Sequence, residues 1–491
     1  MIYHCEDHTC NYWDEGEKLP ERCPQCGRKL LRANEADMTG DDWTALGNTL
    51  SDAEASDKKR MVDCFRKAAY LGSAWGVCNL GICMEQGNGV EADPVQAFWL
   101  YQQAVEMGSL NAVCCLGVCY EYGIGTAPDA KQAAELYCKA AEYGSPRGQM
   151  LLAHAFHDGI GVEADAAEAV HWVRAAAYQR YGEGMHRLGV CYEYGDGVEQ
   201  NWERAVHWFR EAAESGVSVA MADLGYCYEK GCGVEQSWEQ AFSWYRRGAE
   251  CGYPVSMSNL GLCYKRGYGV EQNWQEAIKW YEQGAQCGDL QSMHNLARCY
   301  ERGEGVEQDM KKAICWYERA AEQNHPAAMN SLGECYAMGR GVPRDLETAM
   351  EWYRRAAELG EAMADYNMGW HLEQAGKLSE AYAHYRKAAD GNDDSAWWAL
   401  GRFYENGVVV AQDGKEARRC YETGEKLGSV KCKMRLARCK LLGIGGRRAK
   451  KAGLDLCRQA LELAKESSEK EDYGYEAEMN LLRRTIAENE S

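Results

Sequence analysis

The chain has 491 residues and a formal net charge of −20, which opposes the broad basic surface that a phosphate backbone requires. No apolar run approaches the roughly 20 residues of a membrane span, and the first residues lack the basic and apolar segments of a signal peptide. We therefore expect a cytoplasmic protein whose main partner is neither nucleic acid nor a membrane. Apolar residues make up 46% of the sequence and proline only 8 residues, as in a folded, helix-rich protein.

Four cysteines near the N-terminal end have the spacing of a metal site. Cys5 and Cys10 are followed by Cys23 and Cys26, and two short cysteine loops at this separation can place four thiolates around one tetrahedral Zn²⁺. The segment resembles a zinc ribbon, but four residues separate its first two cysteines where two is usual. His8 has the usual gap from Cys5 and stays open as the alternative to Cys10.

This zinc site would be structural, because protein atoms fill all four positions and leave none for water or substrate. We expect one Zn²⁺ per chain to stabilise residues 1–36, a segment too short to fold by itself. A redox role for Cys23 and Cys26 lacks the βαβ context of that motif, since no strand period appears in the sequence.

One segment recurs along the rest of the chain at a fixed interval. Each copy has a leucine, a small residue after it, Cys-Tyr in many copies, and then a Gly-x-Gly loop. A period of this size indicates one supersecondary unit stacked on itself, and hence a solenoid. The marker residues, mostly 36 residues apart, are Leu46, Leu80, Leu116, Leu152, Leu188, Leu224, Leu260, Leu296, Leu332, Met368, Leu400 and Leu436.

Each copy predicts two helices. In residues 217–252, Ala220, Leu224 and Cys227 share one face of a first helix, which the Gly-x-Gly loop ends because glycine favours the left-handed C-cap. The second helix begins at Ser237, and Gln or Glu three residues later in most copies predicts capping boxes. The equivalent positions in the other copies are all good N-cap residues: Asp93, Asp129, Asp165, Asn201, Asn273, Asp309, Asp345 and Asp413.

The core between repeats is expected to contain the Trp-Tyr pairs of the second helices, such as Trp244-Tyr245, because they share a helical face with buried alanines. Gly225 has no side chain and lets another helix approach closely. One cysteine column, three residues after the marker, is expected to be buried and reduced, because stacked helices lie roughly 10 Å apart and a disulfide needs Cα atoms within about 7 Å. Its members are Cys83, Cys119, Cys191, Cys227, Cys263, Cys299 and Cys335.

From about Met38 to Lys465 the sequence resembles Sel-one-like repeats, a branch of the tetratricopeptide-type helical repeats. The resemblance implies an all-α fold, an α/α solenoid superhelix of about twelve 36-residue helix-loop-helix repeats that acts as an interaction scaffold. The expected domains are a zinc ribbon (1–36), the repeat solenoid (37–465) and a C-terminal capping helix and tail (466–491). One repeat departs from the pattern, because the loop after Met368 lacks four residues. An elongated monomer is our default expectation.

The residue two after each marker points about 200° away from it, at 100° per residue, and should face away from the core. In superhelices of this type the first helices line the concave surface. Apolar residues there, with amides one position before the marker, would suit an extended peptide; the alternative is a tight superhelix that covers them. We name this set the inner column: Ile82, Val118, His154, Val190, Tyr226, Leu262, Arg298, Glu334 and Trp370.

The function predicted from these features is non-enzymatic binding of a protein or peptide. The candidate partner-binding residues are Tyr226, Asn259, Leu262, Asn295 and Arg298, and we identify no catalytic residues.

Two other functions remain open. Cysteine-rich members of the repeat family are linked to β-lactam hydrolysis, but this chain lacks their regular cysteine pairing. Arg22, Arg28, Lys29 and Arg32 beside the zinc ribbon would give a nucleic-acid adaptor only a modest, salt-sensitive attraction. A metal shared by His154 and His157 lacks an evident third ligand.

Overall fold

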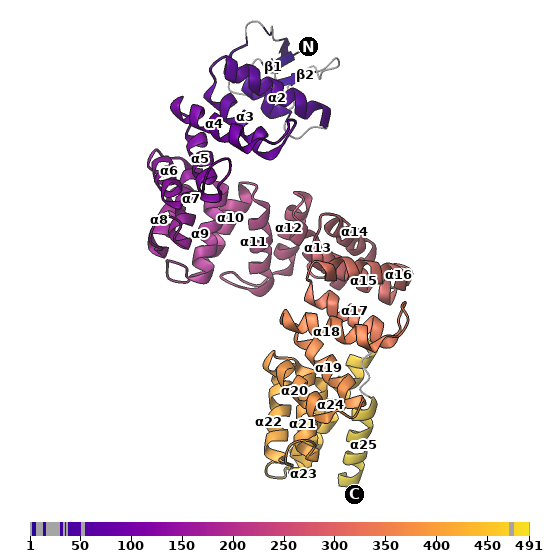
Figure 1. Ribbon diagram of the computed structural model, residues 1–491. Coiled ribbons are helices and arrows are strands. Elements are labelled where there is room, and N and C mark those ends of the chain that lie inside the picture. Colours follow the sequence, from indigo (N-terminus) through magenta and orange to yellow (C-terminus); the bar gives the residue numbers. More distant parts are fainter. Residues whose placement is uncertain are drawn as a thin grey trace. The chain divides into compact units, whose positions relative to one another are not determined.

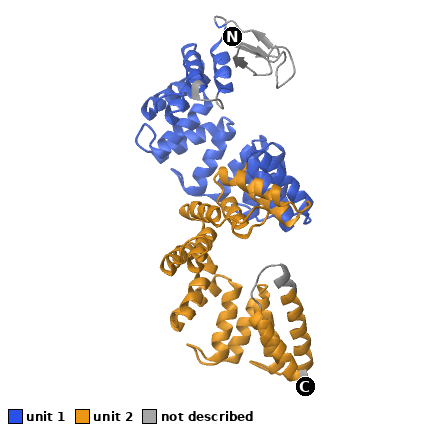
Figure 2. Ribbon diagram, turned by 90° about the vertical axis from the view of Figure 1, so that its right-hand side faces the viewer, with its two compact units in different colours: residues 1–252 blue, residues 253–491 orange. Residues whose placement is uncertain are grey.

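The computed structural model describes residues 2–5, 13–15, 30–32, 35, 38–50, 55–470 and 476–490. The chain divides into two compact units, Met1–Gly252 and Tyr253–Ser491 (Figure 2). Unit 1 contains β1 (Ile2–Cys5), β2 (Trp13–Glu15), β3 (Leu30–Arg32), α1 (Gly40–Thr49), α2 (Ala55–Tyr70), α3 (Ala74–Gln86), α4 (Pro94–Glu106), α5 (Leu110–Tyr122), α6 (Ala130–Glu142), α7 (Pro146–Asp158), α8 (Ala166–Tyr178), α9 (Gly182–Tyr194), α10 (Trp202–Glu214), α11 (Ser218–Lys230) and α12 (Trp238–Glu250).

Unit 2 continues the same series of helices (Figure 1). It contains α13 (Pro254–Arg266), α14 (Trp274–Gln286), α15 (Leu290–Arg302), α16 (Met310–Glu322), α17 (Pro326–Met338), α18 (Leu346–Glu358), α19 (Ala362–Gln374), α20 (Leu378–Asp390), α21 (Asp394–Asn406), α22 (Gly414–Lys426), α23 (Val430–Leu442), α24 (Lys450–Lys470) and α25 (Glu476–Glu490).

Consecutive helices pair as hairpins, α1 with α2 and so on to α23 with α24. This confirms the α/α solenoid of about twelve repeats, six in each unit. The shortened repeat is also confirmed, since only Ala375, Gly376 and Lys377 join α19 to α20. At the C-terminal end α25 packs on α23 and α24, and the Arg435 guanidinium lies 2.7 Å from the Glu478 carboxylate. No helix in the described ranges is both long and apolar enough to span a membrane.

A small antiparallel sheet precedes the helices, in the strand order β2-β1-β3. Tyr3 of β1 pairs with Asp14 of β2 and with Arg32 of β3. The sequence shows no strand period here because strands of three or four residues are too short to reveal one. Cys5 ends β1. The other expected zinc ligands, Cys10, Cys23 and Cys26, and the alternative His8, lie outside the described residues.

The Gly-x-Gly loop ends most of the first helices, as predicted, and also joins neighbouring repeats; α1 and α19 end without it. Gly231 caps α11 in the left-handed conformation, with φ of 73°. Gly233 follows with φ of 69°, and a Cβ atom there would lie 2.4 Å from the main-chain carbonyl of Trp202 in the preceding repeat. Only glycine combines this conformation with this approach, so the motif is structural.

The predicted N-caps of the second helices are confirmed, but the predicted capping boxes are wrong. Asp93 accepts a hydrogen bond from the Gln96 main-chain N–H at 2.9 Å, and the other caps do likewise. A capping box also needs the third residue to accept from the cap's own N–H. That N–H is already bonded, since Asp93 donates to the Met84 carbonyl at 2.8 Å. The Met84 carbonyl thus accepts the hydrogen bond that the side chain of the third residue would accept in a capping box.

Buried tyrosines from the second helices fill the core of most repeats. The Tyr245 ring lies over Gly225, where a Cβ atom would be 2.5 Å from a ring carbon, so the predicted close approach at this glycine is confirmed. The hydroxyl donates to a glutamate at the end of the first helix. These pairs are Tyr101–Glu85, Tyr137–Glu121, Tyr245–Glu229, Tyr317–Glu301, Tyr385–Glu373 and Tyr421–Glu405.

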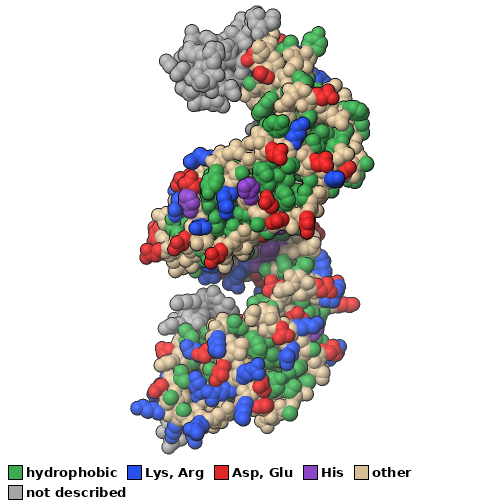
Figure 3. Space-filling view, turned by 90° about the vertical axis from the view of Figure 1, so that its left-hand side faces the viewer, with side chains coloured by type: hydrophobic (Ala, Val, Ile, Leu, Met, Phe, Trp, Pro, Cys, Tyr) green, Lys and Arg blue, Asp and Glu red, His purple; other side chains and the backbone are tan. Residues whose placement is uncertain are grey.

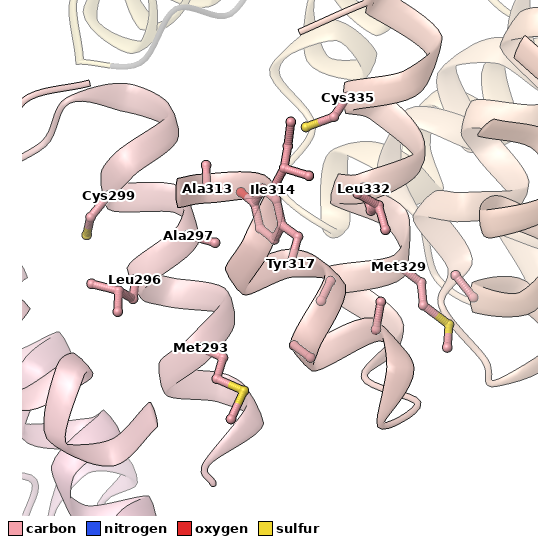
Figure 4. Packing of buried hydrophobic residues seen from close by; sticks show 14 of the residues in the cluster. Met293, Leu296, Ala297, Cys299, Ala313, Ile314, Tyr317, Met329, Leu332 and Cys335 are labelled. Carbon is pink, nitrogen blue, oxygen red and sulfur yellow. The ribbon is translucent and has the colours of Figure 1, made fainter. Parts of the chain in front are cut away.

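Figure 4 shows Tyr317 of α16 between the helix that carries Leu296 and the helix that carries Leu332. The tryptophan of each Trp-Tyr pair is less buried than its tyrosine: Trp316 is only partly buried, and the Arg319 guanidinium lies over its ring at 4.7 Å. The expectation that both residues form the core is therefore correct for tyrosine and only partly correct for tryptophan. The cysteine column is buried, as expected.

Two repeats with a core tyrosine lack the glutamate acceptor. Ala337 takes its place in the repeat of Tyr353, and the other case is the repeat of Tyr281. Lys265 takes the place of the glutamate, and its ammonium group lies 3.1 Å from Glu304. The buried Tyr281 hydroxyl has no hydrogen-bond partner among the described residues.

This difference predicts opposite effects of the same substitution. Tyr317→Phe should destabilise the protein by about 1.5–3 kcal/mol, because it removes a buried hydrogen bond to a carboxylate. Tyr281→Phe should cost nothing, or stabilise slightly, because it removes a hydroxyl without a partner. Denaturant unfolding of both variants measures the difference, and equal losses would contradict it.

Candidate partner-binding surface

The inner column lies on the first helices and is exposed only in part, because Ile82, Val118 and Val190 pack partly buried against the core. Leu224 and Leu260 are fully buried, whereas Tyr226 is 45% exposed and Leu262 is 37% exposed. Trp370 is exposed to the same extent as Leu262. On the face drawn in Figure 3, hydrophobic side chains are exposed in groups between charged ones.

The five predicted binding residues do not all belong to one unit. Tyr226 lies on α11 of unit 1, whereas Asn259 and Leu262 of α13 and Asn295 and Arg298 of α15 belong to unit 2. In unit 2, Asn259, Asn295 and Arg298 are partly buried, and the Asn295 side-chain oxygen accepts from Gln291 at 3.3 Å. The structure therefore brings four of the five onto two successive first helices. Whether they bind a partner stays a prediction.

Several polar side chains expected to face a peptide backbone bind the neighbouring repeat instead. Asn79 donates to Asn48 at 2.9 Å, and the Asp223 carboxylate lies 2.7 Å from His186 Nε2. Sequence reasoning missed these bonds because each joins two successive first helices. One partner directly precedes its marker residue, and the other lies within two residues of the marker of the preceding repeat. They fix the spacing of successive first helices.

Charged members of the inner column in unit 2 are also held in place. Arg340 lies 2.7 Å from Glu301 and 3.3 Å from Glu334. Asn367 donates to Glu334 at 3.2 Å. Burial raises the pKa of Glu334, against these favourable contacts. The surface is thus a fixed pattern of apolar and charged groups, which favours recognition by a rigid face.

A buried histidine lies behind this surface. His294 is 8% exposed, its Nε2 is 3.2 Å from the Ser331 hydroxyl, and its Nδ1 has no partner among the described residues. Burial, then the charges of His325, Arg298 and Lys265, lower the pKa of His294 to about 3. The imidazole is therefore neutral in the folded protein.

A cavity of about 560 Å³ opens in unit 1, between α7, α8 and α9. His154 and His157 line it beside two carboxylates: His154 Nε2 is 3.1 Å from Asp158, and His157 Nε2 is 3.2 Å from Asp196. The described residues contain no group of three or more side chains suited to a metal ion, so a shared metal at the two histidines gains no support. The sequence analysis did not identify this cavity.

A polar cluster adjoins the cavity. Arg147 donates to Asn111 at 2.6 Å and lies 3.6 Å from the Cys115 sulfur. The Cys78 thiol, through a hydrogen bond, and Arg147, through its charge, lower the pKa of Cys115 despite its burial. Cys115 is therefore more acidic than the buried cysteines of the regular column, whose thiols have raised pKa values.

Comparison with solved structures finds a protein of similar fold. A structure of c5321, a protective antigen present in uropathogenic Escherichia coli strains and displaying an SLR fold, is 30% identical with a TM-score of 0.59, and the match covers 87% of this chain and 90% of that one. A Sel1 repeat protein from Oxalobacter formigenes is 31% identical with a TM-score of 0.46, over 50% of this chain and 96% of that one.

No curated protein is significantly similar in sequence. The family model described as Sel1 repeat matches residues 76–109, 112–145, 146–181, 182–217, 218–253, 254–289, 290–325, 326–361, 362–393 and 396–429.

The neutral His294 predicts acid sensitivity in unit 2. Its folded pKa of about 3 lies below the unfolded value of about 6.5, so the unfolded chain binds a proton first as the pH falls. Stability should therefore decrease between pH 6.5 and 3, by at most about 1.4 kcal/mol per pH unit for this group. Asparagine occupies this position in the next repeat, as Asn330. His294→Asn should therefore reduce the dependence of the unfolding free energy on pH, measured by denaturant unfolding at pH 7.5 and 5.5. His171→Asn, at an exposed histidine, is the control; an unchanged slope for His294→Asn would contradict the assignment.

Proposed function

The chain belongs to the Sel1 repeat family, and we propose that it is a non-enzymatic scaffold that binds a protein or peptide across its first helices. The observation that carries this proposal is the exposed inner column. Leu262 and Trp370 remain more than a third exposed on helices whose neighbouring polar groups are fixed by bonds between repeats. Apolar groups held on a rigid face suit partner side chains that become buried on binding.

The partner we propose has apolar side chains along an extended or helical segment. A net charge of −20 disfavours a polyanionic partner, and Arg340 of the proposed surface is already paired with Glu301 and Glu334. We also propose that the protein acts in the cytoplasm as a monomer; the cysteine column packs as small buried side chains, as expected of thiols in a reducing compartment.

Leu262→Asp tests the proposed surface. Affinity capture from the native cell should recover the partner with wild-type protein, and the variant should weaken binding by roughly 2 kcal/mol, about thirtyfold, as at a central contact. Because Leu262 is 37% exposed, the melting temperature should change little.

Two matched variants separate binding from folding. Gln275→Asp places the same charge on an exposed second-helix position of the same repeat and should leave capture unchanged. Leu260→Asp puts the charge at a fully buried position and should lower the melting temperature strongly. Equal unfolding of the Leu260 and Leu262 variants would mean that the column is packing and not a binding surface.

A structural Zn²⁺ at the N-terminal segment is a separate proposal, carried by the spacing of Cys5, Cys10, Cys23 and Cys26. The location of Cys5 at the end of a strand in a three-stranded sheet supports it, since such short strands need an additional link to be stable.

Metal analysis of reduced protein should give one zinc per chain. Chelation should leave the helical circular dichroism nearly unchanged, because each repeat contacts mainly its neighbours. Cys23→Ser should abolish zinc binding, and His8→Ala should have no effect if Cys10 is the ligand. The proposal would be refuted if the purified reduced protein contained no zinc, or if chelation reduced its helical content.

A further inference from the structure

The cavity in unit 1 exists because one repeat lacks its core aromatic ring. In the repeats from residue 76 to 429, the second helix contributes a tyrosine or phenylalanine that is almost fully buried, except in residues 146–181. That repeat has Val173 instead, and Val173 lines the cavity. The aromatic residues of the other repeats are Tyr101, Tyr137, Phe209, Tyr245, Tyr281, Tyr317, Tyr353, Tyr385 and Tyr421.

The same repeat also lacks the acceptor for the missing hydroxyl. The glutamate that accepts from tyrosine in the neighbouring repeats, for example Glu121 for Tyr137, is replaced by His157. His157 lines the cavity as well. Both members of the recurring Tyr–Glu pair are therefore replaced in one repeat. Ala153 replaces the glycine beside the ring, as Ala297 does beside the retained Tyr317, and the rest of the space is open.

The cavity has an apolar floor and a polar rim. Val170 and Val173 of α8 and Ala153 of α7 form the floor, and all three are buried. His154 and Arg187 line it too, with side chains 50% and 41% exposed. His154 is a member of the inner column, so the cavity opens on the face proposed to bind a partner.

The charges of the rim nearly cancel. Two guanidinium groups, of Arg147 and Arg187, face three carboxylates, of Asp158, Asp196 and Glu183. A phosphate or another polyanion would meet these carboxylates, so the lining favours a neutral ligand. The volume lies within the roughly 300–1,000 Å³ of small-ligand sites, and Asp158 and Asp196 can accept a hydrogen bond from a hydroxyl.

We propose that this cavity binds an aromatic side chain, preferentially tyrosine, from the protein or peptide partner. The incoming ring takes the place that the repeat's own tyrosine fills elsewhere, and its hydroxyl donates to Asp196 or Asp158. This inference rests on the proposed scaffold function, to which it adds the chemical identity of one partner side chain.

The probe for the test is N-acetyl-L-tyrosinamide, titrated into the full chain by calorimetry and by NMR of the histidine ring protons. We expect saturable binding that shifts the His154 and His157 signals. N-acetyl-L-phenylalaninamide should bind more weakly because it lacks the hydroxyl, and N-acetyl-L-leucinamide weaker still. No saturable binding of the tyrosine probe, or equal binding of all three, would overturn the proposal.

Restoring the missing pair should close the site. The double variant Val173→Tyr with His157→Glu should reduce binding of the tyrosine probe at least about tenfold, equivalent to 1.4 kcal/mol. Phe209→Tyr is the matched control, because it adds a tyrosine hydroxyl to the next repeat at a residue that does not line the cavity. Undiminished binding by a folded double variant would overturn the proposal.

Asp196→Asn keeps the test decisive if the double variant fails to fold. Asp196 is 34% exposed, so the variant should fold. It should weaken the tyrosine probe severalfold and leave the phenylalanine probe unchanged; equal effects on both probes would contradict the hydroxyl contact. If the tyrosine probe does not bind, the capture experiment with Leu262→Asp still tests the scaffold function. If the probe binds but no partner is captured, only the scaffold function is refuted.

Discussion

In most repeats, the contact between a buried aromatic ring and a glycine of the partner helix sets the geometry of the hairpin. The ring of Tyr245 occupies the space where Gly225 has no side chain, so the two helices of the hairpin approach closely. The hydroxyl then reaches a glutamate at the end of the first helix, which fixes where that helix ends relative to the second. The loop glycines and the N-caps complete the hairpin around this contact.

The helices and their ends could be predicted from the sequence because each depends on local chemistry that recurs in most of the repeats. Marker leucines, loop glycines and cap residues such as Asp93 act within a few residues of their own position. The capping boxes were wrong for a non-local reason, since the cap N–H of Asp93 is used by the Met84 carbonyl. Bonds such as that between Asn79 and Asn48 depend on the distance between first helices, which periodicity does not give.

The candidate sites show the same division. The outward direction of Leu262 follows from helical geometry and agrees with its exposure. The cavity could have been found from the sequence, because Val173 interrupts the aromatic column in the same repeat in which His157 interrupts the glutamate column. Regular columns indicate the core, however, and only the packed structure shows that these two departures adjoin the same space. In a repeat protein, the residues that break the pattern therefore carry more information about specific recognition than those that keep it.

The loop glycine that approaches the preceding repeat has a consequence for how such chains change length. Gly233 meets the main-chain carbonyl of Trp202, and a carbonyl is the same whatever side chain accompanies it. This one contact of the joint is thus independent of the side chain at residue 202. A genetic duplication or loss of one 36-residue block would recreate the same joint at the new boundary. Surface residues could then diverge within each block, and the array could lengthen or shorten without a new interface having to arise.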